Sequence, residues 1–291
     1  MPVHNAPAEQ PRVRVLGPIS VEGPDGTPVE PPGALAKALV AVLAVVPQSA
    51  GGGVGVEAIV DELWGDAQPR NAKAALQTLV SRLRASTGDG VLRSIPGGYA
   101  LGVDTAQLDL SLAVQSSTDA SADLAALDAA LALWRGEPGT DLGDAPIAEA
   151  LAERASAARS ALLERRARVR ADAGDHAGSA ADLDVLLDLH PLNEQLVEAQ
   201  LRELAASGRR ADALAAFAAF RERLADELGV SPSARLVALN TELLRDDPAP
   251  IAPTAPASTS AGWACAPRRT RSSAATRISR RSSSPCPATG S

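Results

Sequence analysis

Two segments of this chain repeat one pattern of small and apolar residues at an interval of 34 residues. The segment "AGDHAGSAADLDVLLDLHP" has its first glycine at Gly174, and "SGRRADALAAFAAFRERLA" has its glycine at Gly208. The residues that correspond in this alignment are Leu183 with Phe217, Leu186 with Phe220, and Ser179 with Ala213. Apolar pairs are expected to face inward and small pairs to lie where helices touch. A period of 34 residues is that of helical hairpins stacked in an array.

Apolar periodicity predicts helices throughout the segment that contains this repeat. The expected helices cover residues 122–134, 147–173, 178–189, 193–207, 210–228 and 233–245. Aromatic residues are only 2% of the chain, so a core would consist of Ala, Leu and Val, which suits closely packed helices. We therefore expect a tetratricopeptide-like helical domain over residues 111–248.

The first part of the chain has a different pattern. Residues 12–31 alternate around a "PDGT" turn and predict short strands, and residues 91–103 predict a hairpin around "PGG". Helices are expected at 35–46, 56–64 and 70–86, with "SAGGGVGV" as a loop between the first two. A helix followed directly by a glycine-tipped hairpin is the order of a winged helix. The predicted fold class is mainly α, with a small α/β N-terminal domain at 12–110 and a flexible segment at 1–11.

The third of these helices is unusual because it is purely basic in an acidic chain. Residues 68–86, "QPRNAKAALQTLVSRLRAS", hold four cations and no carboxylate, whereas the whole chain has a formal net charge of −7. On a helical wheel the apolar stripe consists of Ala72, Leu76, Leu79, Val80 and Leu83. The opposite surface is cationic and amide-bearing, with small residues at its centre.

Such a surface is suited to the major groove of DNA, where amides read base edges and cations meet phosphates. The alternative interpretation is a solvated amphipathic helix whose charges share a sign by chance. On the DNA interpretation Asn71 and Gln77 are the candidates for base contacts, and the arginines are candidates for phosphate contacts. The residues expected to face DNA are Arg70, Asn71, Lys73, Gln77, Thr78, Ser81, Arg82 and Arg84 on the helix, and Arg93, Gly98 and Tyr99 on the wing.

Several motifs, taken together, resemble a known family. "RVRVLGPISVEG", "ELWG", "LQTLVSRLR" and "PGGY" look like the OmpR-like winged helix of the Streptomyces antibiotic regulatory protein family. The segment from "ALALWRGEP" through "ELGVSPSARLVALNTELL" resembles the bacterial transcriptional activation domain of that family. The resemblance covers about residues 12–247, in the family's domain order. One departure is the first helix, which is usually more basic in the family and here retains only Lys37.

This resemblance implies a transcriptional activator of biosynthetic genes. Members of the family bind direct repeats near promoters as side-by-side protomers and recruit RNA polymerase. The implied partners are therefore double-stranded promoter DNA, RNA polymerase holoenzyme and further copies of the chain on DNA. Residues 1–110 have a net charge of −3 and residues 111–248 of −10, so any DNA contact must come from a local patch.

Other classes of protein find little support in the sequence. His4, His176 and His190 are isolated, the two cysteines lie in the C-terminal tail, and no phosphate-binding glycine loop ends in Lys and Ser or Thr. We therefore expect no enzyme activity, no cofactor and no metal. The N-terminus lacks the pattern of a signal peptide, and the apolar run "ALAKALVAVLAVV" is too short to span a bilayer. A cytoplasmic protein without membrane contact is expected.

The tail at 249–291 begins as a Pro/Ala/Ser/Thr linker and continues with six arginines and no acidic residue. Such a composition predicts disorder. The tail is either a genuine basic extension or the product of a shifted reading frame in a longer relative.

Two alternatives to a DNA-binding activator remain open. One is a helical-repeat scaffold whose concave face binds a peptide or protein. The other is a signal-gated regulator, in which the repeats hold a small molecule or a phosphoprotein.

Overall fold

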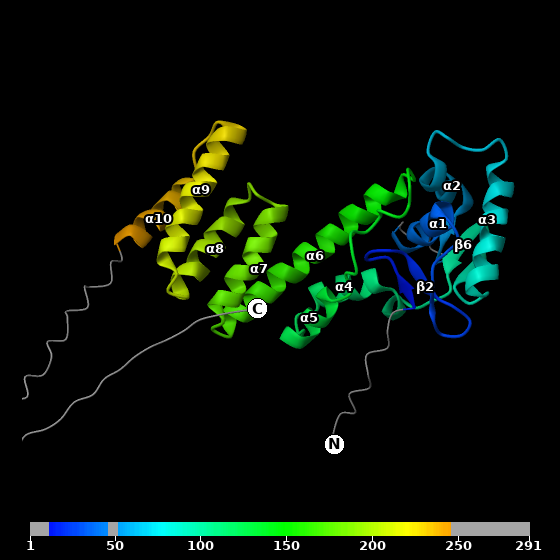
Figure 1. Ribbon diagram of the computed structural model, residues 1–291, viewed down its shortest axis with the longest axis horizontal. Helices are drawn as coiled ribbons and strands as arrows, with labels where there is room; N and C mark the ends of the chain where they lie inside the picture. Colours follow the sequence, from blue (N-terminus) through cyan, green and yellow to red (C-terminus); the bar gives the residue numbers. More distant parts are fainter. Residues whose placement is uncertain (1–11, 46–51, 246–291) are drawn as a thin grey trace, which may run out of the picture. The chain divides into compact units, whose positions relative to one another are not determined.

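The computed structural model describes residues 12–45 and 52–245, which fall in one compact unit (Figure 1). The chain is mainly helical, with two small sheets near its start. The predictions for residues 1–11 and for the tail at 249–291, including Trp263 and both cysteines, lie outside the described residues. The elements in chain order are β1 (Val13–Arg14), β2 (Ser20–Glu22), β3 (Pro28–Val29), α1 (Ala34–Val45), β4 (Val54–Gly55), α2 (Val56–Trp64), α3 (Ala72–Thr87), β5 (Leu92–Ile95), β6 (Gly98–Leu101), a short 3-10 helix (Thr105–Gln107), α4 (Asp109–Thr118), α5 (Leu124–Leu131), α6 (Ile147–Asp172), α7 (His176–Leu189), α8 (Glu194–Ala206), α9 (Arg210–Leu228) and α10 (Ala234–Arg245).

The first sheet is antiparallel, with the strand order β1-β2-β3. The predicted turn at "PDGT" joins β2 to β3, and it sets Val21 opposite Val29. The Asp25 carboxylate accepts the backbone N–H of Thr27 at 3.0 Å, which closes the turn as an Asx motif. The strand prediction for residues 12–31 is confirmed.

The second sheet has three strands in the order β4-β6-β5, whereas the sequence predicted only a hairpin. Residues 54–55 were expected to be loop but form β4, which pairs with Gly98 and Tyr99 of β6. The glycine-rich sequence hid this strand because glycine has low strand propensity. Gly98 is needed at this position, since a Cβ there would lie 2.0 Å from the carbonyl oxygen of Val54. Helices α1, α2 and α3 with this sheet complete the predicted winged helix.

Helix α4 was missed by the sequence analysis, and the predicted domain boundary after residue 110 falls within it. Its sequence, "DLSLAVQSST", buries only three residues, so its apolar period is weak. One cluster of buried hydrophobic side chains extends from Val13 to Leu162 and includes residues of α5 and α6. Helix α1 also packs against α6. The winged helix and the first helices after it therefore share a core.

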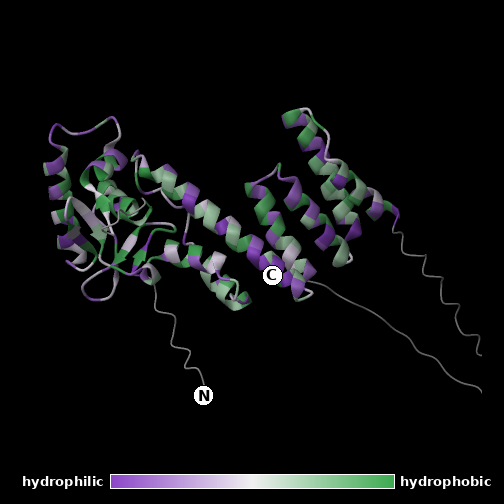
Figure 2. Ribbon diagram, turned by 180° about the vertical axis from the view of Figure 1, so that it is seen from behind, coloured by the Kyte–Doolittle hydropathy of each residue, from purple (hydrophilic) through white to green (hydrophobic). Residues whose placement is uncertain are grey.

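The later helices confirm the tetratricopeptide-like prediction. Helix α7 packs against α6 and α8, and α8 against α9 (Figure 1). Hydrophobic and hydrophilic residues mix along these helices, as expected of helices buried on one side (Figure 2). Gly174 and Gly208 both have a φ of 80°, so both repeats turn in the same left-handed conformation. All six residues that the repeat alignment paired are buried, namely Leu183, Phe217, Leu186, Phe220, Ser179 and Ala213.

Candidate nucleic-acid interface

Helix α3 begins two residues later than predicted, and this changes the roles of Arg70 and Asn71. The side-chain oxygen of Asn71 accepts the backbone N–H of Ala74 at 3.1 Å, so Asn71 is the N-cap of α3. Arg70 lies before the helix and is exposed. The cap engages the carboxamide oxygen that was expected to read a base edge.

The remaining helical pattern of α3 agrees with the wheel. Leu76, Leu79, Val80 and Leu83 are buried, and Ala72 is half-buried. The side chains that are exposed on the opposite surface are Lys73, Gln77, Thr78, Ser81 and Arg82. The Thr78 hydroxyl donates to the carbonyl of Ala74 at 2.9 Å, which leaves its oxygen free to accept. The structure therefore keeps one polar, cationic surface on α3.

Arg84 differs from the other cations of α3 because its guanidinium is already engaged. Its Nη2 donates to the carbonyl of Leu92 at 3.1 Å and to the hydroxyl of Ser94 at 2.9 Å. Both acceptors belong to β5, the first strand of the wing. Arg84 thus links α3 to the wing and is half-buried between them.

The wing is the hairpin of β5 and β6. Arg93 on β5 is exposed, and Tyr99 on β6 is half-buried. The tip of the hairpin is Pro96–Gly97, and Gly98 lies buried within β6. Gly98 and Tyr99 therefore lie on β6 of the wing and not at its tip, since Gly98 pairs on both sides with neighbouring strands.

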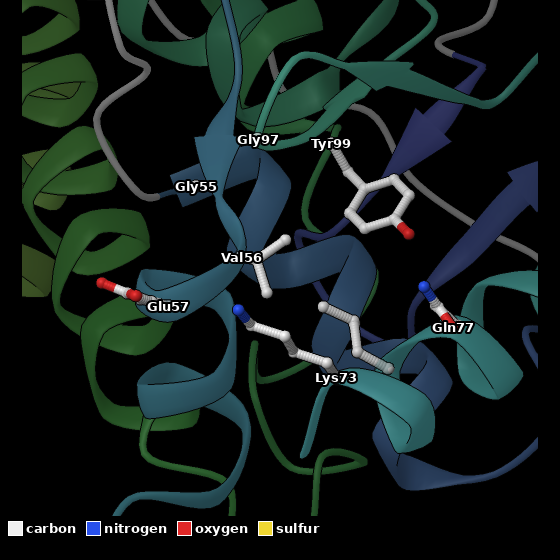
Figure 3. A pocket seen from close by; sticks show the side chains of 8 residues that line it. Gly55, Val56, Glu57, Lys73, Gln77, Gly97 and Tyr99 are labelled. Atoms are coloured by element: carbon white, nitrogen blue, oxygen red, sulfur yellow. The ribbon is translucent and has the colours of Figure 1, made fainter. Parts of the chain in front are cut away.

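Two surface cavities line the groove between α3 and the wing, with volumes of about 420 Å³ and 580 Å³. Gln77 and Tyr99 contribute to both cavities, so they lie where the two meet. Figure 3 shows the first cavity, with Lys73 and Gln77 on α3 and Tyr99 across from them. Each cavity has one acidic residue in its lining, Glu57 in the first and Asp89 in the second. The Glu57 carboxylate points away from Tyr99 and Gln77 (Figure 3).

Three exposed cations of α3 and the wing have no acidic partner within the part of the chain that the structure describes. Lys73, Arg82 and Arg93 form no salt bridge there, whereas the salt bridges of the other helices neutralise many of their arginines. Exposed cations without a carboxylate partner can bind phosphate groups without first breaking an ion pair. The surface is therefore locally positive in a domain whose net charge is negative.

Lys37, by contrast, is not available to an anion from solution. Its Nζ lies 3.0 Å from the Glu30 carboxylate and 3.0 Å from the Asp141 carboxylate, and its side chain is 14% exposed. Burial alone would lower the pKa of Lys37, but the hydrogen bonds to these two carboxylates raise it overall. The one cation retained in α1 therefore joins the winged helix to the segment before α6.

Asp109 also connects the winged helix to the helices that follow it, and the sequence analysis did not predict this role. It is 1% exposed, and its carboxylate accepts the backbone N–H groups of Val15 and Leu16. Arg135 lies 3.9 Å from it, and burial raises the pKa of Asp109 above its usual value. Helix α4 was not predicted from the sequence, so the role of a buried carboxylate at its first residue could not be predicted either.

The histidines and tryptophans have structural contacts. His176 Nδ1 lies 2.9 Å from the Glu203 carboxylate, and His190 Nε2 lies 3.1 Å from the Ser160 hydroxyl. Trp64 and Trp134 are half-buried against the shared core. Among residues 12–45 and 52–245, no three His, Cys, Asp or Glu side chains are grouped so as to hold a metal ion. Within the same ranges, no helix has the length and apolarity needed to cross a membrane.

Comparison with known proteins gives one family match and several relatives. A sequence model of the bacterial transcriptional activator domain matches residues 105–244. The regulatory protein DnrI of Streptomyces peucetius is 34% identical over 257 residues, which cover 81% of this chain and 93% of DnrI. The transcriptional regulator RedD of Streptomyces coelicolor is 34% identical, over 84% of this chain and 73% of RedD.

The regulatory protein AfsR of Streptomyces coelicolor is 39% identical over 66% of this chain, but this chain spans only 20% of the length of AfsR. Among solved structures, Mycobacterium tuberculosis EmbR in complex with a low-affinity phosphopeptide superimposes with a TM-score of 0.65. It is 31% identical, and the match covers 82% of this chain and 66% of the EmbR chain.

The relatives are transcriptional regulators, and this chain shares with EmbR a winged helix joined to tetratricopeptide-like helices. The chain belongs to the Streptomyces antibiotic regulatory protein family, as the motifs of its sequence predicted.

Proposed function

We propose that this chain is a sequence-specific DNA-binding activator of a biosynthetic gene cluster. On this proposal α3 enters the major groove of promoter DNA, and the wing lies along the neighbouring phosphates. The protomers bind direct repeats side by side and recruit RNA polymerase holoenzyme. Such a protein acts in the cytoplasm, where promoter DNA lies, and it needs no enzyme activity.

The observation that carries the proposal is a set of exposed polar and cationic side chains on α3 and the wing that form no salt bridge with the described residues. Lys73, Gln77, Ser81 and Arg82 are exposed along α3, and Arg93 is exposed on the wing beside it. Ala74 is also exposed on this surface, and its small side chain permits close approach to DNA. Major-groove recognition needs this combination, because amides identify bases whereas cations neutralise phosphates.

On this proposal the predicted site residues have four roles. Gln77 is the proposed base-reading residue, since its amide lies at the centre of the groove and Asn71 is engaged as a helix cap. The proposed phosphate contacts are Arg70, Lys73, Arg82 and Arg93. Thr78, Ser81 and Tyr99 line the surface between them and donate or accept hydrogen bonds there. Gly98 acts only through the close pairing that shapes the wing.

The experiment that tests this function is a selection from a random duplex pool with the full chain, at two salt concentrations. Enrichment of direct repeats spaced by about one helical turn, ~10.5 bp, is the expected result. Binding should weaken with salt, with a slope of about −0.9 for each phosphate contact. No enriched sequence at either salt concentration would overturn the proposal.

Charge reversal on α3 tests the proposed surface directly, and charge reversal on α9 is the matched control. Arg82→Glu should abolish retention of the selected DNA. Arg221→Glu, which reverses an equally exposed arginine on α9, should leave it unchanged. Equal loss in both variants would indicate a general effect of net charge.

A helical-repeat scaffold is the second candidate function, and one cavity favours it. The cavity has a volume of about 220 Å³ and is lined from α6, α7 and α8, with Leu183 and Leu196 among its apolar residues. Its polar lining includes Glu164, Arg168 and Glu203. If this cavity carries the function, Arg82→Glu will leave partner binding intact, whereas Leu196→Glu will abolish it.

A further inference from the structure

Arg84 and Arg82 are two residues apart on α3, but they face different environments. Arg82 is exposed on the surface proposed to meet DNA, and it has no side-chain partner among the described residues. Arg84 is half-buried and makes hydrogen bonds to Leu92 and Ser94 on the wing. The two arginines therefore form a natural pair for comparison, with equal charge and different contacts.

The acceptor on Leu92 lies on the free edge of the wing. The strand order β4-β6-β5 makes β5 the edge strand of its sheet. The carbonyl of Val91 accepts the N–H of Gly102 at 2.8 Å, on the β6 side. Because successive carbonyls in a strand point in opposite directions, the carbonyl of Leu92 points away from β6. Among the described residues, Arg84 is the hydrogen-bond donor to this carbonyl, so removing Arg84 would leave the carbonyl without a donor from them.

The wing also shares an apolar cluster with α3, since Leu92 and Leu101 are buried in the same cluster as Leu83. Its sheet is held on the far side by β4, which is only two residues long. Arg84 lines the second cavity of the groove together with Gln77 and Tyr99, so it lies where α3 and the wing face each other. A charged, two-acceptor contact of this kind restrains orientation as well as distance.

We infer that Arg84 is a positioning residue, which fixes the wing against α3 so that both engage DNA in one register. The inference rests on the proposed function, because it assigns Arg84 a task within the same site. It differs from the sequence prediction, in which Arg84 held a phosphate directly. The two roles predict different measurements, since a phosphate contact contributes to the salt dependence and a positioning contact contributes to the order of the wing.

The first test uses hydrogen exchange on the free full-length chain, without DNA. Arg84→Met should accelerate exchange of the β5–β6 amides, residues 92–101, by about tenfold, since one charged hydrogen-bond pair is lost. Arg82→Met, the matched control, should leave these amides unchanged. Arg84→Lys keeps one donor within reach and should restore part of the protection. Exchange in α8, residues 194–206, should not change in any variant, which excludes general unfolding.

The second test uses footprinting on the selected DNA. Arg84→Met should lose protection of the phosphates that flank the site, where the wing lies, and should keep the contacts of α3. Arg82→Met should keep protection of the flanking phosphates and lose contacts of α3. It should also reduce the salt slope of binding by about 0.9.

The inference is overturned if Arg84→Met leaves the exchange of residues 92–101 at the wild-type rate. It is also overturned if this variant lowers the salt slope by about 0.9 while the flanking protection persists. If the wild-type chain binds no DNA, the proposed function fails, whereas the exchange experiment still decides whether Arg84 holds the wing.

Discussion

The carboxylate of Asp109 accepts the backbone N–H of Val15 at 2.9 Å, although the two residues are 94 positions apart. The first residue of α4 thereby fixes the end of β1, and Leu16 donates to the same carboxylate. A second hydrogen bond joins the same regions, because the backbone N–H of Arg135 donates to the carbonyl of Leu16 at 2.9 Å. The winged helix is thus tied to the helices that follow it through backbone groups, which tolerate little change in geometry.

Replacing the Asp109 carboxylate should destabilise the whole unit. Asp109→Ala leaves the buried N–H donors of Val15, Leu16 and Leu110 without an acceptor, at a cost of about 1–3 kcal/mol for each. Chemical denaturation measures this loss. Asp144→Ala, which removes an exposed carboxylate, should change the free energy of unfolding by less than about 0.5 kcal/mol. Equal effects would show that the hydrogen bonds of Asp109 contribute nothing.

The stability contributed by Asp109 should also depend on pH. Burial raises its pKa above the usual 3.8, against the lowering effect of the N–H donors and of Arg135. The folded state therefore binds the proton first as the pH falls. Between the raised pKa and 3.8, the free energy of unfolding of the wild type should rise with falling pH relative to Asp109→Asn. A difference that is constant from pH 7 to about pH 4, or that has the opposite slope, would contradict this assignment.

Lys37 should affect stability and leave DNA binding unchanged. Lys37→Met leaves the carboxylates of Glu30 and Asp141 without their cation, and should destabilise the chain by about 1–3 kcal/mol. The salt slope of DNA binding should stay at the wild-type value. Lys73→Met is the matched variant on α3, and it should show the converse, with a slope reduced by about 0.9 and unchanged stability. A reduced slope for Lys37→Met would place Lys37 on DNA.

A buried carboxylate also holds the first helical repeat. Asp182 has a side chain that is 3% exposed and binds both Arg166 and Arg170, at 2.6 Å and 2.9 Å. Asp182→Asn removes the buried carboxylate that Arg166 and Arg170 share and leaves them Asp128 and Asp175, so it should cost about 1.5–3 kcal/mol in thermal or chemical unfolding. Asp172→Asn, at an exposed position on the same α6, should have little effect. DNA binding of the folded fraction should be unaltered in both variants.

The sequence was sufficient to predict the parts of the fold that carry a period. The spacing from Gly174 to Gly208 predicted the helical hairpins, and the apolar stripe of α3 predicted which surface is exposed. Elements without a period were missed, such as the two-residue β4 and the serine-rich α4. The cap at Asn71 was within reach of sequence analysis, because asparagine directly before a helix is a typical N-cap.

The contacts of individual charged residues could not be predicted in the same way. Arg84 and Arg82 look alike in the sequence, and only the position of β5 separates their roles. Lys37 looked like a remnant of a basic surface until Glu30 and Asp141 were found beside it. Such partners come from distant parts of the chain, so no local pattern records them.

The shared core has a consequence for the exchange of parts between members of this family. A hybrid regulator cut after residue 110 would sever α4 and separate Val13 from the Leu127 and Leu162 that share its cluster. A junction between α6 and α7, after Asp172, leaves that cluster intact, but it separates Leu163 of α6 from Leu186 of α7 and breaks the ion pairs of Asp182 with Arg166 and Arg170. A functional hybrid should therefore take the residues on both sides of its junction, such as Asp182 with Arg166 and Arg170, from the same parent.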